Sequence, residues 1–167
     1  MGKIQSILIK LFSEIVDRNF NFDQLDDRII MQKIVFFLSE LGITINEYRF
    51  TLETYGPFSQ SLSNDVHEIC ASTEIYSDCF PDFISSAITF LKQNIFAEYN
   101  NKCKYTMREW LEAISTLVYV KRYMRPTDSL SELASNLSII KTNMVHVDEN
   151  EKVIPYCEAI LSYNTSK

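Results

Sequence analysis

The strongest constraint on the fold is a segment, residues 27–41, that is apolar around most of a helical circumference. Its apolar residues are Ile29, Ile30, Met31, Ile34, Val35, Phe36, Phe37, Leu38 and Leu41. A helix without a wide polar face is normally buried between other elements. Gly42 follows, and a residue without Cβ commonly ends a helix in the left-handed conformation. We therefore expect this helix to lie at the centre of the fold.

The pattern changes period directly after this helix. Tyr48, Phe50 and Leu52 alternate with polar residues over 47–54, which predicts a strand with one face on the core. Gly56 and Pro57 predict a turn that opens a helix over about 58–70. We expect residues 73–78 to pair with 48–54 as a small β ribbon.

Helical spacing and capping signals predict the remaining elements. Helices are expected over 3–17, from 81 with Phe83 facing inward, from the capping box at 106–109, over 129–140 and over 153–161, with a loop at 143–150 and a frayed tail after 162. The predicted fold class is mainly α (α+β), with about six to seven helices around one core. A small antiparallel β-hairpin and a winged-helix-like element near residues 28–79 complete it.

Length and composition indicate one globular domain. The chain has 167 residues, of which 46% are hydrophobic and 23% charged, as is usual for a folded domain. The polar segment 100–104 is the best candidate for a boundary, and we interpret it as a hinge between halves 1–99 and 104–163 that share one core. The prediction is therefore a single domain over 1–167.

Charge and cysteine usage favour a cytoplasmic protein without a broad nucleic-acid surface. The formal net charge of −6 disfavours extensive phosphate binding. Cys70, Cys79, Cys103 and Cys157 show no CxxC spacing and are expected to be reduced thiols. We predict no signal peptide, because polar residues interrupt the N-terminal apolar run, and no membrane span, because no apolar run approaches about 20 residues.

Two polar clusters could carry chemistry, and each has a structural alternative. His67, Cys70 and Cys79 lack an obvious fourth ligand, so we predict no metal and no cofactor, with Cys70 in the core. Lys121, Arg122 and Arg125, interleaved with tyrosines, are candidate nucleic-acid or phosphate contacts, although cations also suit a helix C-terminus. No constellation of catalytic groups stands out, which favours a protein that is not an enzyme. An enzyme is the third alternative, and a deep pocket lined with His67 or paired carboxylates would indicate it.

One central block resembles a known family. The block comprises Arg28, Gln32, Lys33, Phe36 and Leu38, then Tyr48 and Phe50, then Tyr55, Gly56, Pro57, Phe58 and Ser59, then Leu62 and Asp65. This pattern is similar to the YwgA-like and Panacea-type (SocA-like) family of small prokaryotic or phage proteins. Segments 110–120, 153–161 and Lys141 are compatible with the family's later helices, so the likeness extends over about residues 25–163. Met31 stands where the family usually has Leu, a change that preserves volume.

The resemblance implies a mostly helical fold and a role in protein binding. Panacea domains act as antitoxins that neutralise toxin partners by direct contact, relatives accompany mobile elements and defence islands, and one is a proteolytic adaptor. The expected partner is therefore another protein, a toxin or a defence effector. The resemblance implies no catalytic residue, and it sets no oligomeric state.

The residues themselves support a binding surface. Gln32 and Lys33 are polar positions in an otherwise apolar helix, so at least one must reach a partner group or the rim, and backbone groups of the segment 56–59 could supply such a partner. We predict a protein-binding surface formed by Gln32, Lys33, Tyr55, Gly56, Pro57, Phe58 and Ser59. The alternative is a winged-helix-like regulator with helix 58–70 in a DNA groove, which the absence of Lys and Arg from that helix disfavours.

Overall fold

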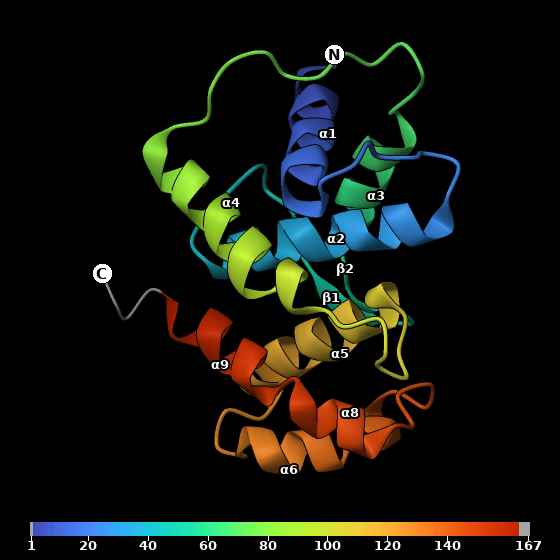
Figure 1. Cartoon of the computed structure of the whole chain (residues 1–167), viewed down its shortest axis with the longest axis vertical. Coiled ribbons are helices and arrows are strands. Elements are labelled where there is room, and N and C mark those ends of the chain that lie inside the picture. Colours follow the sequence, from blue (N-terminus) through green and yellow to red (C-terminus); the bar gives the residue numbers. More distant parts are fainter. Residues whose placement is uncertain (1, 164–167) are drawn as a thin grey trace.

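The computed structural model describes residues 2–163, which fold mainly into helices with one small antiparallel hairpin (Figure 1). The elements in chain order are α1 (Lys3–Val16), α2 (Leu25–Glu40), β1 (Thr51–Glu53), β2 (Gly56–Phe58), α3 (Gln60–His67), α4 (Asp82–Asn94), the 3₁₀ turn η1 (Phe96–Glu98), α5 (Met107–Tyr119), the π-helical turn η2 (Val120–Met124), α6 (Leu130–Ser135), α7 (Leu137–Ile140), α8 (Val147–Lys152) and α9 (Ile154–Leu161). The predicted class, mainly helical with a small hairpin, is confirmed.

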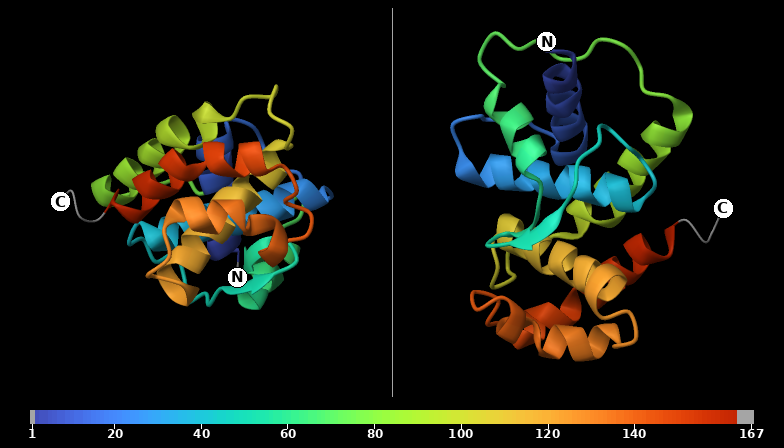
Figure 2. Two further views of the ribbon diagram at one scale, coloured as in Figure 1. Left: turned by 90° about the horizontal axis from the view of Figure 1, so that it is seen from below. Right: turned by 180° about the vertical axis from the view of Figure 1, so that it is seen from behind.

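Helix α2 crosses the middle of the molecule. It packs against α1, α3 and α4 on one side and against α5 on the other (Figure 1). The hairpin lies between α2 and α5, as Figure 2 (right) shows, and β2 contacts both helices. The central position that the apolar pattern predicted for this helix is therefore confirmed.

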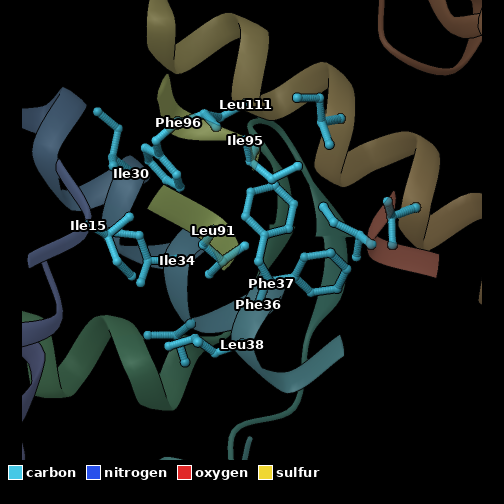
Figure 3. Close-up of a cluster of buried hydrophobic side chains, with 14 of the residues drawn as sticks. Ile15, Ile30, Ile34, Phe36, Phe37, Leu38, Leu91, Ile95, Phe96 and Leu111 are labelled. Atoms are coloured by element: carbon cyan, nitrogen blue, oxygen red, sulfur yellow. The ribbon is translucent and has the colours of Figure 1, made fainter. Parts of the chain in front are cut away.

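One apolar cluster runs through the fold. Figure 3 shows Phe37 and Ile34 of α2 meeting Ile15 of α1, Leu91 of α4 and Leu111 of α5. All five side chains are at most 1% exposed. Burial of this kind, at roughly 25 cal/mol per Å² of apolar surface, is the main force that holds the helices together. The hairpin and the candidate site are built on this rigid base.

The β ribbon forms from different residues than predicted. Thr51 pairs with Phe58 and Glu53 with Gly56, so the turn segment itself supplies the second strand. Residues 48–50 and 73–78 are not strands. A two-residue connection brings 56–58 directly against 51–53, and such short-range pairing carries little loop-closure entropy. The segment 73–78 instead lies on α1, where the Tyr76 amide donates to the Ser6 carbonyl at 3.3 Å.

Three further predictions about the helices and loops are wrong. Phe83, expected to face inward from α4, is 56% exposed. The predicted helix 129–140 is divided at Asn136 into α6 and α7, and the predicted loop 143–150 contains the start of α8. Buried Asn150 accounts for α8, because its side chain donates to the Met144 carbonyl at 2.9 Å and accepts from the Tyr105 hydroxyl at 2.7 Å. The predicted frayed tail lies outside the described residues from 164 onward.

The capping box predicted at the start of α5 is confirmed and gives a stability prediction. The Glu109 amide donates to Thr106 Oγ1 at 3.3 Å, and the Thr106 amide donates to Glu109 Oε1 at 2.9 Å. Thr106→Ala removes one arm and should lower the free energy of unfolding by about 1 kcal/mol in urea titrations. Thr89→Ala, at an exposed position inside α4, is the matched control and should change it by less than about 0.5 kcal/mol. Equal losses for the two variants would contradict this role for the cap.

Candidate functional site

Gln32 binds the segment that leads from the hairpin into α3. Its Nε2 donates to the Ser59 carbonyl at 3.0 Å, and its Oε1 accepts from the Ser59 amide at 3.0 Å. The carboxamide thus pairs with the backbone in the way that a neighbouring strand would. Ser59 then caps α3, because its Oγ accepts from the Leu62 amide at 3.3 Å. One polar side chain of α2 therefore sets where α3 begins.

Lys33 makes the equivalent contact one residue further along α2. Its Nζ donates to the Pro57 carbonyl at 3.0 Å, and the side chain is 1% exposed. Gly56 has φ of 97° and lies close to α5. A Cβ on Gly56 would stand 3.1 Å from Thr116 Oγ1 and 3.3 Å from Lys33 Nζ. Glycine is required here by both the backbone conformation and the close approach of α5.

Beneath the hairpin lies a cluster of charged side chains, which we call the inner charge cluster: buried Lys33, Glu112 and Lys141 with partly exposed Arg108. Glu112 is 0% exposed, and neither of its carboxylate oxygens has a hydrogen-bond partner within residues 2–163. Burial raises the pKa of Glu112, while Arg108, Lys141 and Lys33 lower it. Burial also lowers the pKa of Lys33 to about 7, although Glu112 acts in the opposite direction. Lys141 donates to the Glu53 carbonyl at 3.4 Å, so two lysines bind the hairpin backbone from inside.

A pocket of about 360 Å³ opens beside this cluster, between α2, the hairpin and α3; we call it the hairpin pocket. Its lining combines apolar surface with a few charges: Leu25, Arg28, Ile29, Gln32, Lys33, Glu53, Thr54, Tyr55, Phe58, Ser63, Val66 and His67. Leu25 is 47% and Tyr55 37% exposed, so two large side chains of this lining remain accessible to solvent. The Arg108 guanidinium carbon lies 5.2 Å from the centre of the Tyr55 ring and holds that ring at the rim.

The structure brings together all seven residues predicted to bind a partner, although most of them are buried. Gln32, Lys33 and Ser59 are at most 5% exposed, and Gly56 and Pro57 are buried as well. Tyr55 and Phe58 retain accessible surface, and with Gln32 and Lys33 they line the hairpin pocket. The first contacts of Gln32 and Lys33 are therefore within the chain, to the backbone of 57–59, and a partner would reach them only through the pocket.

Sequence reasoning missed the contribution of α5. Glu112 and Thr116 are fully buried beneath the hairpin, and Arg108 covers Tyr55. The signal was present, because Glu112 and Thr116 lie one helical turn apart and interrupt an otherwise apolar helix face. Nothing in the pattern connected that face with residues far earlier in the chain.

The basic residues Lys121, Arg122 and Arg125 lie together at η2 and the turn after it, and each has a partner within the chain. Lys121 donates to the carbonyls of Pro126 and Asp128 at 2.8 and 2.7 Å. Arg122 lies 3.4 Å from Glu40 Oε1 and donates to the Leu161 carbonyl at 3.2 Å. Arg125 is largely exposed and pairs with Asp128 at 3.7 Å. These contacts favour the alternative in which the three cations stabilise carbonyls and carboxylates of the chain itself, over phosphate binding.

No group of three or more His, Cys, Asp or Glu side chains that could hold a metal ion occurs within residues 2–163. Cys70 is exposed, which contradicts its predicted place in the core, and it contacts Ser72 and Thr73. The reason is that α3 ends at His67, so the helical period no longer applies at residue 70. Within the same described part of the chain, every helix is too short or too polar to span a bilayer.

None of the protein-family models, curated proteins or solved structures compared with this chain matches it.

Proposed function

We propose that this protein is a non-enzymatic binding module that contacts another protein through the hairpin pocket. The observation that carries the proposal is that exposed Leu25 and Tyr55 both line a largely apolar pocket of about 360 Å³. Apolar pockets with aromatic rims are the usual receivers of an anchoring side chain from a partner. The occupant that fits is an apolar or aromatic side chain of a partner protein.

The construction of the pocket favours a preformed receptor. Its walls belong to α2, α3 and the hairpin, and Gln32 and Lys33 bind the backbone between these elements. A site held by buried hydrogen bonds loses little conformational entropy when a partner enters. The resemblance to Panacea-type proteins fits this role, and we propose an antitoxin-like or antiphage-defence accessory function in the cytoplasm, with a toxin or defence effector as the partner.

The nucleic-acid alternative has weaker support. Helix α3 contains neither Lys nor Arg, so it offers no lysine or arginine charge to neutralise phosphate. A wing formed by residues 73–78 was part of that hypothesis, and those residues lie on α1 instead. The winged-helix hypothesis needs one strand of the wing after α3. Both strands of the hairpin that forms come before α3 in the chain, so it is not such a wing.

A comparison of three versions of the chain tests the proposal. The wild type, Leu25→Asp and Ile139→Asp would be used to capture partners from host lysate with and without nuclease treatment, and any captured protein would then be purified and titrated directly. Ile139 is 77% exposed on α7, away from the pocket, so its variant is the matched control for adding a charge to an apolar surface position. We expect Leu25→Asp to weaken binding at least about tenfold, equivalent to about 1.4 kcal/mol, and Ile139→Asp to bind as the wild type does.

Two outcomes would contradict the proposal. Equal affinity for all three versions in the direct titration would place the contact elsewhere on the chain. Recovery of nucleic acid alone, lost on nuclease treatment, would favour the winged-helix alternative.

A further inference from the structure

A second pocket, of about 380 Å³, lies at the C-terminal end of α2 and is separate from the hairpin pocket. Aromatic rings and one carboxylate line it: Phe36, Glu40, Tyr48, Phe50, Tyr119 and Tyr123. We call it the aromatic pocket. Its lining comes from α2, from the segment before β1, from α5 and from η2, so four parts of the chain converge there.

The rings are packed against one another at an angle. The centres of Phe36 and Phe50 are 5.4 Å apart in an edge-to-face arrangement, and those of Tyr119 and Tyr123 are 5.1 Å apart with their planes tilted by 51°. Phe36 also approaches Tyr119 at 6.3 Å. The faces of aromatic rings carry partial negative charge, and accessible faces around one cavity attract an organic cation. Phe36 is 1% exposed and supports the cavity from below, so the accessible rings are those of Tyr48, Phe50, Tyr119 and Tyr123.

Hydrogen bonds to carboxylates increase the negative character of two of these rings. The Tyr123 hydroxyl donates to Glu40 Oε2 at 2.7 Å, and the Tyr48 hydroxyl donates to Asp65 Oδ2 at 2.6 Å. A phenol that donates to a carboxylate gains electron density, and the ring then attracts a cation more strongly. Burial and the bond to Glu40 raise the pKa of Tyr123 to about 12, so the phenol remains a donor throughout the neutral range.

The carboxylate in the pocket already has partners. Glu40 is 5% exposed and is bound by Tyr123 and by Arg122, whose guanidinium lies 3.4 Å away. A primary ammonium or a guanidinium entering the pocket would bring several N–H donors and would have to compete for this carboxylate. A fully methylated ammonium has no N–H donor, and its methyl groups suit an aromatic wall.

From this geometry we propose that the aromatic pocket binds a quaternary methylammonium group. Such a group occurs on free choline-like compounds and on trimethylated lysine in proteins, and both present the same trimethylammonium to the rings. Arg49 also lines the pocket and is exposed, so its positive charge opposes the binding of a cation there.

The test is to titrate the whole chain with choline and, separately, with 3,3-dimethylbutan-1-ol, the neutral compound of the same shape. NMR signals of the tyrosine rings report the binding. Choline should bind saturably and about tenfold more tightly than the neutral compound, because only the cation gains from the ring faces. Tyr123→Ala should weaken choline binding about tenfold, and Arg49→Ala should strengthen it. Tyr123 is 56% exposed, so the fold should tolerate its removal.

Tyr76→Ala is the matched control, because Tyr76 is an aromatic residue that stacks on Phe80 beside α1, away from the pocket. This variant should bind choline as the wild type does. Equal affinity for choline and the neutral compound, no detectable choline binding, or binding unchanged in Tyr123→Ala would each overturn the proposal. A peptide with trimethyllysine, titrated in parallel, identifies the source: binding tighter than choline indicates a modified protein, and weaker binding indicates a free compound.

Discussion

Replacing Lys33 with methionine is expected to lower the free energy of unfolding by about 2 to 3 kcal/mol at neutral pH. Methionine keeps most of the volume of the lysine stem, so the change acts mainly on the ammonium group. The Pro57 carbonyl loses the donor that binds it at 3.0 Å, and the buried Glu112 carboxylate loses one of its neighbouring cations. Chemical unfolding followed by circular dichroism measures the loss.

The same variant should change the pH dependence of stability. Burial lowers the pKa of Lys33 to about 7 from an ordinary value of 10.5, so above pH 7 the unfolded chain binds a proton that the folded chain does not. The free energy of unfolding of the wild type should therefore gain a rising contribution between pH 7 and 9, of at most about 1.4 kcal/mol per pH unit. Lys33→Met removes this contribution. The difference between the two slopes isolates Lys33 from the other titrating groups.

Lys92→Met is the matched control, because the Lys92 side chain is about half exposed on α4. It should shift neither the stability at pH 7 nor the slope by a measurable amount. The double variant with Glu112→Gln should lose less than the sum of the two single losses, because the carboxylate charge that Lys33 attracts is then absent. Parallel pH profiles for Lys33→Met and the wild type would contradict the assignment.

The elements that the sequence predicted well are those whose signal is local. The all-apolar period of α2, the positive φ at Gly42 and the capping box at Thr106 each depend on residues within a few positions of one another. The alternation at Tyr48, Phe50 and Leu52 also predicted correctly which side chains face the core, since all three pack on it. The predicted strand over 47–54 is longer than β1, because alternating side chains indicate burial of one face and do not require a neighbouring strand.

The sequence predicted only the part of the candidate site that depends on local patterns. The prediction that the backbone of 56–59 could satisfy Gln32 or Lys33 agrees with the observed hydrogen bonds to Pro57 and Ser59. The members from α5, Glu112 and Thr116, come from a part of the chain more than fifty residues away in sequence. Their proximity follows from the packing of α5 on α2 and the hairpin, which no local pattern encodes. The aromatic pocket was missed in the same way.

Gly56→Ala is expected to lower the free energy of unfolding by about 3 kcal/mol, from two separate causes. An L-residue at φ of 97° is strained wherever it occurs. The added methyl group would also lie 3.1 Å from Thr116 Oγ1 and 3.3 Å from Lys33 Nζ, and both of these atoms belong to side chains buried between α2 and α5. Urea unfolding of the variant measures the sum of the two effects.

Gly42→Ala separates these causes. Gly42 has φ of 90°, nearly the same as Gly56, but it is exposed after the end of α2. Its replacement should cost about 1 kcal/mol, the contribution of the backbone alone. The additional loss in Gly56→Ala then measures the free-energy cost of placing a methyl group between the hairpin and the side chains of α5 and the inner charge cluster. Equal losses in the two variants would mean that the hairpin can move away from α5 at little cost, and the walls of the hairpin pocket would then be mobile instead of preformed.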